Sequence, residues 1–281
     1  MGITNKIAYF NSSKNCWLPL TSIPHIECSN FGFAVLQNNL YVIGGCFNQS
    51  ESDLSEHIHP FGFCYNPRKD HWDRIAPMNR ERCRFTLTPI SKTQLIAIGG
   101  CGNNEGSIID GDDQVMNGFD EFEATAEIYN GKLDRWLHLP PLSSGGRSQH
   151  AASMFDNDQI LVSGGLNSYL EVLEDCLILE LGSNAWRSFT PLSCPRADHV
   201  MIKVGHQEVI VVGGWMYDDS NQRQLIDSID RYNPETQSWE IEARVPTPRF
   251  HSGVSLVGDK LHIVGGFHSD MTFEKATGRC Q

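Results

Sequence analysis

The sequence predicts an all-β protein assembled from a repeated four-stranded sheet, and three observations lead to this prediction. A short apolar run that ends in two glycines occurs five times, as "LYVIGG", "LIAIGG", "ILVSGG", "VIVVGG" and "LHIVGG". A tryptophan stands 26 to 28 residues before each of these glycine pairs. Helical periodicity of any length is missing. One phosphate-binding loop would explain one glycine pair but not five, so the repeat decides the fold.

Each repeat has the pattern of four short antiparallel strands. In the first copy, "GFAVL" and "LYVIGG" flank Asn38-Asn39, which predicts a two-residue hairpin turn. The third strand ends at a turn such as Asn66-Pro67, and the fourth strand carries the tryptophan. Seven residues before each tryptophan stands an aromatic residue or a leucine: Phe10, Tyr65, Tyr129, Leu179 and Tyr232. Four antiparallel strands repeated in this way form the blades of a β-propeller.

The repeated residues suit that architecture. A glycine at the end of the second strand has no Cβ, so the backbone can bend there and a neighbouring blade can approach closely. The tryptophan supplies apolar surface that one thin sheet could not otherwise bury. An arginine precedes four of the glycine pairs by 16 or 17 residues: Arg82, Arg147, Arg196 and Arg249. In the first repeat, the corresponding position is assigned to Glu27.

The predicted strands form one propeller domain, residues 1–281. We expect a half-blade at 1–20, full blades at 21–76, 77–140, 141–190 and 191–243, and a half-blade with a tail at 244–281. The two half-blades are complementary, so the first strands could close a five-bladed ring by pairing with "VSLVGDKLHIVGG". The other interpretation is a fragment of a six-bladed propeller.

Composition limits the classes of function. The chain has 281 residues, of which 40% are hydrophobic, as expected of a globular protein with a core. Its formal net charge of -12 argues against nucleic acid as the main partner. No apolar run is long enough to cross a membrane, and the first residues lack a secretory signal. The nine cysteines include no CxxC pair, so we expect reduced thiols and a cytoplasmic protein, with the nucleus as the alternative.

At this point the sequence resembles a known family. A glycine doublet, then "CYNP" or "RYNP", then a tryptophan seven residues after the tyrosine, then "PR" before the next blade, is similar to the kelch repeat. The resemblance covers residues 8–266 and is strongest to the BTB-kelch (kelch-like) proteins. It implies a non-enzymatic, protein-binding propeller that recognises substrates for a cullin-3 ubiquitin ligase. Cullin would be reached only through BTB and BACK domains, which this sequence does not contain. The alternative that the resemblance implies is a propeller that binds actin.

Topology places one set of loops on a common face. In a four-stranded meander, the loop between the second and third strands emerges on the same side as the link to the next blade. The former loops vary in length, with 19, 28, 13 and 17 residues, which is typical of a binding surface. The longest contains eight carboxylates and no Lys or Arg: Glu105, Asp110, Asp112, Asp113, Asp120, Glu121, Glu123 and Glu127. It is either a solvated loop or an acidic lip for a basic peptide.

The arginines before the glycine pairs have two interpretations. They could fix the links between blades by donating hydrogen bonds to carbonyl groups. The resemblance implies instead that arginines and small polar residues at this place line the pocket for an acidic or polar segment of a partner; the candidates are Arg82, Arg84, Arg147, Ser148, Arg196 and Arg249. We add the residues that follow the glycine pairs, because exposed aromatic and polar groups there could be binding hot spots: Phe47, Asn167, Trp215, Tyr217, Phe267 and His268.

Enzymatic function has weak support in the sequence. Some kelch propellers bind iron through Glu-x3-Asp-x3-His, and here Gln49, Asp53 and His57 have that spacing, with His59 nearby. Glutamine replaces the carboxylate, so a metal-dependent enzyme is only a minor alternative. No pattern of a catalytic nucleophile stands out, and we expect neither enzymatic activity nor a cofactor. Cys46 and Cys101 follow two of the glycine pairs and are either small buried residues or oxidant sensors.

Overall fold

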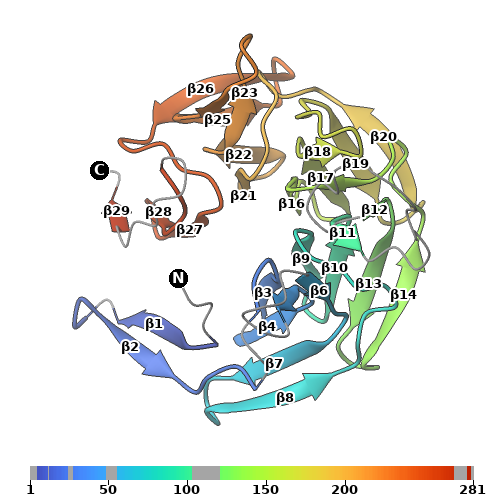
Figure 1. Ribbon diagram of the computed structural model, residues 1–281, viewed down its shortest axis with the longest axis vertical. Helices are drawn as coiled ribbons and strands as arrows, with labels where there is room; N and C mark the ends of the chain where they lie inside the picture. Colours follow the sequence, from blue (N-terminus) through green and yellow to red (C-terminus); the bar gives the residue numbers. More distant parts are fainter. Residues whose placement is uncertain are drawn as a thin grey trace, which may run out of the picture. The chain divides into compact units, whose positions relative to one another are not determined.

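The computed structural model describes residues 5–11, 13–24, 28–48, 56–102, 121–268 and 277–279, and every regular element among them is a β-strand (Figure 1). The chain divides into two compact units, Met1–Leu139 and Pro140–Gln281. In the part of the chain that the structure describes, no helix is long and apolar enough to cross a membrane. The prediction of an all-β protein is confirmed.

Unit 1 contains a two-stranded sheet and two four-stranded sheets. Strands β1 (Ile7–Asn11) and β2 (Cys16–Leu20) form the two-stranded sheet. The first four-stranded sheet consists of β3 (Gly32–Leu36), β4 (Asn39–Ile43), β7 (Gly62–Asn66) and β8 (His71–Ile75). The second consists of β9 (Thr86–Ser91), β10 (Gln94–Ile98), β13 (Ala126–Asn130) and β14 (Arg135–Leu139). Both are antiparallel meanders, and β3 lies beside β9.

Unit 2 repeats this design. The third four-stranded sheet contains β16 (Ala151–Met154), β17 (Gln159–Ser163), β19 (Cys176–Glu180) and β20 (Ala185–Phe189). The fourth contains β21 (Val200–Gly205), β22 (Glu208–Val212), β25 (Ser228–Asn233) and β26 (Ser238–Arg244). A last sheet has β27 (Gly253–Val257), β28 (Lys260–Val264) and β29 (Thr277–Arg279). Strand β21 lies between β16 and β27.

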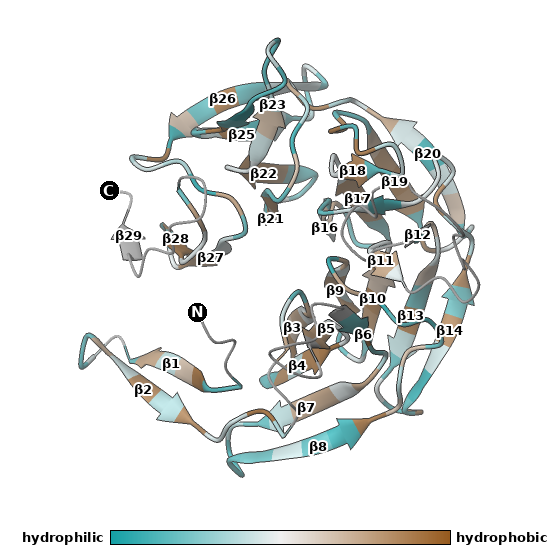
Figure 2. Cartoon of the chain, viewed as in Figure 1, coloured by the Kyte–Doolittle hydropathy of each residue, from teal (hydrophilic) through white to brown (hydrophobic). Residues whose placement is uncertain are grey.

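Hydrophobic side chains concentrate on the inner strands of each meander. In Figure 2, β4 and β10 are largely brown, whereas the fourth strand β8 is largely teal. Leu95, Ile96, Ala97 and Ile98 of β10 are completely buried, so both faces of this strand pack against other parts of the protein. One core of unit 1 joins residues of the first and second sheets, such as Ile43 with Leu95 and Tyr129. Adjacent sheets therefore stabilise each other, as propeller blades do.

The repeated tryptophans lie on the last strands of the four-stranded sheets, as predicted. Each stands opposite the residue seven positions earlier, so the spacing in the sequence is that of a cross-strand pair, such as Tyr129 with Trp136. The rings of this pair lie 5.2 Å apart. The indole nitrogen of Trp136 donates a 3.0 Å hydrogen bond to the carbonyl of Ala76, which follows the preceding sheet. The tryptophan thus joins two sheets by both apolar and polar contacts.

The first hairpin turn is shifted by one residue from its predicted position. The turn consists of Gln37 and Asn38, and Leu36 pairs with Asn39. Both turn residues have positive φ angles, of 52° and 63°, as a tight two-residue hairpin turn requires. The shift keeps Leu36 buried on the same face as Ala34, so the burial pattern of β3 determines the register.

The last sheet and the first, two-stranded sheet each have a defined pairing of strands. Strand β28 pairs with β27 at one edge and with β29 at the other. The third strand of the last sheet is therefore Thr277–Arg279. The choice between a closed five-bladed ring and a fragment of a six-bladed propeller stays a prediction. Among the described residues, β1 pairs only with β2.

Candidate functional site

The glycine pairs connect each sheet to the link between sheets. Gly45 donates a 2.8 Å backbone hydrogen bond to the carbonyl of Arg82 in the link to the second sheet. Gly165 and Gly214 donate in the same way to the carbonyls of Arg196 and Arg249. A Cβ on Gly44 would lie 2.6 Å from the carbonyl oxygen of Arg82, which is too close for any other residue. The glycines are therefore structural, because only they allow this approach.

A second set of contacts lies just beyond each glycine pair. The residue after the pair forms an antiparallel bridge with the residue after the arginine, as in Cys101 with Cys83 and Trp215 with Ala197. The loop between the second and third strands thus runs beside the link between sheets, as topology predicted. We call these two segments together the loop face of each unit. Short ribbons extend it: β5 (Cys46–Asn48) with β6 (Glu56–Ile58), β11 (Cys101–Gly102) with β12 (Glu121–Phe122), β15 (Arg147–Ser148) with β18 (Leu166–Asn167), and β23 (Trp215–Tyr217) with β24 (Arg223–Leu225).

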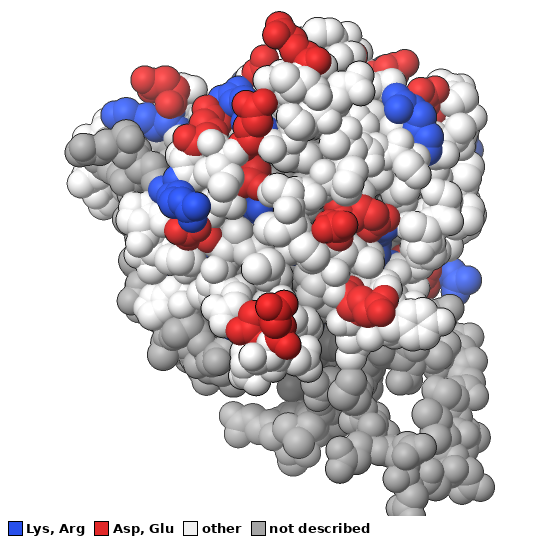
Figure 3. Space-filling model, turned by 90° about the horizontal axis from the view of Figure 1, so that it is seen from above, with Lys and Arg blue, Asp and Glu red and all other residues white. Residues whose placement is uncertain are grey.

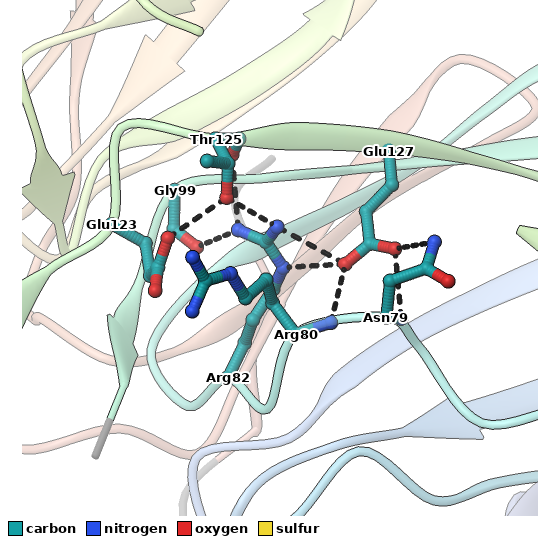
Figure 4. Close-up of polar contacts among 7 residues, drawn as sticks. All are labelled: Asn79, Arg80, Arg82, Gly99, Glu123, Thr125 and Glu127. Atoms are coloured by element: carbon teal, nitrogen blue, oxygen red, sulfur yellow. Dashed lines mark hydrogen bonds and ion pairs between the residues drawn. The ribbon is translucent and has the colours of Figure 1, made fainter. Parts of the chain in front are cut away.

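Arg82 is completely buried, and its guanidinium is surrounded by acceptors from the second sheet (Figure 4). It lies 3.1 Å from the carboxylate of Glu127, which is also fully buried. The same guanidinium donates to the carbonyls of Gly99 at 2.9 Å and Thr125 at 3.0 Å. Burial lowers the pKa of Arg82, and the charge of Glu127 opposes that shift. Glu127, expected in the acidic loop, lies in β13 and also accepts hydrogen bonds from Asn79.

Three arginines of unit 2 occupy equivalent places. Arg147 lies 2.7 Å from the carboxylate of Asp175 and donates to the carbonyl of Gly164. Arg196 lies 2.8 Å from the buried carboxylate of Asp230. Arg249 is 6% exposed and donates to the carbonyl of Gly265 at 3.0 Å.

The geometry favours the first interpretation of the arginines. In all four, the guanidinium reaches the carbonyl of the first glycine of its own sheet's pair, and the side chain is almost entirely inaccessible. A buried guanidinium that is already bound by internal acceptors cannot meet a partner without breaking those bonds. The four arginines fix the links between sheets, and direct contact with a partner remains an untested prediction for them.

The first sheet has no arginine at the equivalent place. The bridge of Ser29 with Cys46 corresponds to that of Cys83 with Cys101, so the counterpart of Arg82 is Cys28 rather than Glu27. Glu27 itself lies outside the described residues. Phe63 occupies the position equivalent to Asp230. Phe63 pairs with Val42 and Asp230 pairs with Val211. Both valines lie two residues before the glycine pair of their own sheet. Cation and anion are thus replaced together, which avoids an unpaired buried charge.

The residues two positions after this arginine (or after Cys28) share an uncommon backbone conformation. All have φ angles between 52° and 56°: Asn30, Arg84, Gln149, Asp198 and His251. We call them the left-handed link residues. The amide of Arg84 donates to the carbonyl of Asn30, that of Asp198 to Gln149, and that of His251 to Asp198. This bonding requires positive φ, which glycine adopts at the least cost, yet none of the five is glycine.

Polar side chains at strained backbone positions are a recognised mark of functional surfaces. Hydrogen bonding explains the positive φ angle of the left-handed link residues. It does not explain why these positions carry polar side chains instead of glycine. Only Arg84 was predicted as a site residue. The others could have been located from the sequence, since all lie two residues after the arginine position. Their residue types alone, however, do not predict a positive φ.

In unit 1 the loop face carries aromatic rings next to a buried thiol cluster. Phe47 lies half-buried, with ring centroids 5.7 Å from His57 and 5.9 Å from His59. Cys46 and Cys101 are buried together with Cys83. Hydrogen bonds to Cys101 and Cys46, followed by burial, raise the pKa of the Cys83 thiol. This favours the unreactive protonated form.

The proposed metal triad is only partly described. Gln49 and Asp53 lie outside the described residues, while His57 and His59 both face Phe47. Within the described residues, no group of three His, Cys, Asp or Glu side chains is placed to hold a metal ion. Most of the acidic loop also lies outside them, including Glu105, Asp110, Asp112, Asp113 and Asp120.

In unit 2 the loop face carries a cluster of aromatic and charged side chains from two successive sheets. Trp215 is 2% exposed, and its indole nitrogen lies 3.4 Å from the carboxylate of Asp198. That carboxylate also lies 3.4 Å from Nδ1 of His251. Phe250 stacks on Phe267 with ring centroids 5.4 Å apart. We call Asp198, Trp215, Tyr217, Arg223, Phe250, His251 and Phe267 the aromatic cluster.

The remaining predicted site residues differ in what they can offer to a partner. Tyr217 is 41% exposed and lies against Trp215. His268 is half-buried, next to Phe267 in the sequence. Asn167 is half-buried and organises its own loop, with Oδ1 accepting from the amides of Tyr169 and Glu171. Ser148 is completely buried and pairs with Leu166 in the β15–β18 ribbon.

Charge is not segregated on the surface that Figure 3 shows. Acidic side chains are scattered over this face of the described residues, with basic ones between them. Several exposed arginines are paired, such as Arg231 with Glu242 at 2.7 Å and Arg187 with Glu180 at 3.2 Å. Charge recognition on this face therefore depends on individual side chains rather than on one large field.

Comparisons with known proteins agree with this architecture. A model of the kelch motif matches residues 204–246. Kelch-like protein 36 of Rattus norvegicus is 23% identical over 274 residues, covering 96% of this chain and 41% of the relative. Kelch-like protein 26 of Danio rerio is 27% identical over 241 residues, covering 86% of this chain and 36% of the relative. The chain thus spans about two-fifths of the length of these curated relatives.

Two further likenesses extend the comparison. Kelch domain-containing protein 7A of Mus musculus is 26% identical over 267 residues, covering 93% of this chain and 29% of the relative. The solved structure of YjhT superimposes with a TM-score of 0.79 at 15% identity, covering 97% of this chain and 86% of that one. At that identity the likeness concerns the fold alone. The repeated four-stranded sheets, the kelch motif and these relatives together show a β-propeller with kelch-type blades that is similar to kelch-like proteins.

Proposed function

We propose that this propeller is a non-enzymatic protein-interaction module that binds its partner at the loop face. The observation that carries this proposal is the set of left-handed link residues. Their backbone conformation costs about 1 to 2 kcal/mol per residue for most side chains other than glycine, and less for Asn and Asp. Five equivalent positions nevertheless carry Asn, Arg, Gln, Asp and His. Side chains retained at such a cost are explained by a role in recognition.

The surrounding residues support the same surface. The aromatic cluster includes two of these residues, Asp198 and His251, and aromatic side chains with arginine are among the residues most enriched in binding hot spots. The buried arginines hold the links between sheets in place beneath these side chains. A partner would therefore meet a preorganised surface, which lowers the entropic cost of binding.

In the whole protein, we infer that the propeller recognises substrates for a cullin-3 ubiquitin ligase. The similarity to kelch-like proteins supports this inference, and cullin would be reached through domains outside this sequence. We assign the protein to the cytoplasm. Actin is the competing partner that the sequence analysis raised.

Affinity capture from a cell lysate with the tagged propeller tests the proposal. The wild type is compared with Arg84→Gly and with a double variant, Gln149→Gly and His251→Gly. Glycine removes the side chains while easing the backbone conformation, so the variants should remain folded. Proteins captured by the wild type and lost with either variant would support the loop face. Equal capture by all three chains would contradict it.

Two further readouts separate the alternatives. Captured proteins that accumulate in cells when cullin-3 is inhibited, and fall again when it is restored, would support the adaptor role. Co-sedimentation of the purified propeller with filamentous actin, lost in the glycine variants, would replace that role with actin binding.

A further inference from the structure

The β23–β24 ribbon gathers three side chains on one face. Tyr217 pairs directly with Arg223, and Trp215 pairs with Leu225. Since side chains alternate along a strand, Trp215, Tyr217 and Arg223 project from the same side of the ribbon. The ring of Tyr217 packs edge-on against Trp215 at 5.2 Å.

The guanidinium of Arg223 is held between two aromatic rings. Its Cζ lies 4.3 Å from the ring centroid of Trp215 and 5.5 Å from that of Phe250. Both rings are fixed in turn, Trp215 by burial and by Asp198, and Phe250 by stacking on Phe267. Cation–π contacts of this kind orient the planar guanidinium while its N–H groups stay at the surface, because Arg223 is exposed.

Among the described residues, no carboxylate pairs with Arg223. Other exposed arginines of unit 2 do have such partners, including Arg231 with Glu242 and Arg244 with Asp227. The acidic residue on the same ribbon, Asp218, is occupied by the amides of Ser220 and Gln222 and by Gln224. Asp198 is occupied by Trp215 and His251. Arg223 is therefore a preoriented cation whose donors face outward.

We propose that Arg223 binds an oxyanion on a segment of the partner protein, with an apolar neighbour of that anion packing on Tyr217. This inference rests on the proposed function and assigns a partner chemistry to one part of the loop face. The fork of N–H groups suits bidentate binding of a carboxylate or a phosphate. The source of the oxyanion is an Asp or Glu side chain or a phosphorylated residue, and the test distinguishes the two.

Selection from a phage library of random 16-residue peptides provides a probe. Peptides selected by the wild-type propeller are synthesised with a fluorophore, and their dissociation constants are measured by fluorescence polarisation. We expect an Asp or Glu next to an apolar residue to recur among them. The propeller variants are Arg223→Gln and, as the matched control, Arg187→Gln, which removes an exposed charge from β20.

The expected result is a loss of about tenfold or more in affinity for Arg223→Gln, with no more than a twofold change for Arg187→Gln. Replacing the recurrent acid of the peptide by Gln should cause a similar loss with the wild type and little further loss with Arg223→Gln. A phosphoserine at that position that binds tighter than Glu would assign the site to a phosphorylated segment. Binding of the acidic peptide to Arg223→Gln within twofold of the wild type would overturn the proposal.

The same experiment separates this inference from the function on which it rests. Peptides that lose affinity with Gln149→Gly and His251→Gly but not with Arg223→Gln would leave the loop face intact and refute the role of Arg223. Failure of the wild type to select any peptide, or selection of peptides that no variant affects, would refute both.

Discussion

The guanidinium of Arg196 lies 2.8 Å from the carboxylate of Asp230, and both side chains are almost completely buried. Asp230 also accepts a hydrogen bond from Ser193, and Arg196 reaches Ser228 at 3.3 Å and the carbonyl of Gly213 at 3.5 Å. This pair ties the link before the fourth sheet to the third strand of that sheet. Its place in the first sheet is taken by Cys28 and Phe63, so the fold accepts either a complete ion pair or none.

Asp230→Ala should reduce the free energy of unfolding by about 3 to 5 kcal/mol, because it leaves a buried guanidinium without its counter-ion. The double variant Arg196→Met with Asp230→Leu should recover much of that loss, since it restores an apolar pair like that of the first sheet. Urea unfolding followed by tryptophan fluorescence measures both. Arg187→Met, which breaks an exposed pair, serves as the control and should change stability by less than about 1 kcal/mol. Equal losses in Asp230→Ala and the control would contradict the structural role of the pair.

Trp136→Phe should destabilise the second sheet by about 1 to 3 kcal/mol. The substitution removes the 3.0 Å hydrogen bond to the carbonyl of the half-buried residue Ala76 and reduces the apolar contact of the ring. Trp17→Phe is the matched control, because Trp17 is 49% exposed on β2. Thermal and urea unfolding of both proteins should show a clear loss for Trp136→Phe alone. Indistinguishable midpoints would mean that the indole is not a bridge between sheets.

Because of the phenol of Tyr65, the free energy of unfolding should depend on pH in the alkaline range. Burial, followed by the hydrogen bond to Asp70, raises the pKa of the Tyr65 phenol from 10.0 to about 12. A raised pKa means that the neutral phenol stabilises the folded state below pH 10, and that this contribution is lost as the pH rises from 10 towards 12. The difference in urea midpoint between the wild type and Tyr65→Phe should therefore shrink over that range. Tyr169→Phe, at an 85% exposed position, controls for unrelated alkaline effects. A constant difference from pH 8 to pH 12 would contradict the assignment.

Gly213→Ala and Gly258→Ala separate backbone strain from steric overlap. The two glycines have nearly the same φ, at 63° and 65°. A Cβ on Gly213 would overlap the carbonyl oxygen of Arg249, whereas one on Gly258 would meet nothing within 4 Å. Gly258→Ala should cost about 1 to 2 kcal/mol from strain alone. Gly213→Ala should cost clearly more, as measured by urea unfolding, and equal costs would show that the close approach is unimportant.

The repeat made much of the fold predictable from the sequence. The recurring Tyr129 and Trp136 positions marked the third and fourth strands, and the glycine pairs implied close approach of the next blade. That the seven-residue spacing is that of a cross-strand pair became clear only from the structure. The first hairpin turn was displaced by one residue because Asn38 and Asn39 both favour turns, and only the burial of Leu36 decides between the two registers.

The site was harder to predict, for identifiable reasons. The sequence shows that Arg82 recurs but not whether its guanidinium meets a carbonyl or a partner, and only burial separates the two. Glu27 was assigned to the arginine position because the spacing varies by one residue, and backbone pairing moves that position to Cys28. Arg223 escaped notice because only the pairing of β23 with β24 brings it beside Tyr217 and the ring of Trp215.

The central claim is that the left-handed link residues recognise a partner while the buried arginines hold the fold. It is tested most directly by measuring unfolding and partner binding on the same preparations of His251→Gly and Arg196→Met. For a partner obtained by affinity capture, His251→Gly should keep its urea midpoint and bind at least about tenfold more weakly. Arg196→Met should unfold at clearly lower urea, because it leaves Asp230 without its counter-ion. Normal binding by His251→Gly, together with normal stability and lost binding in Arg196→Met, would contradict the account.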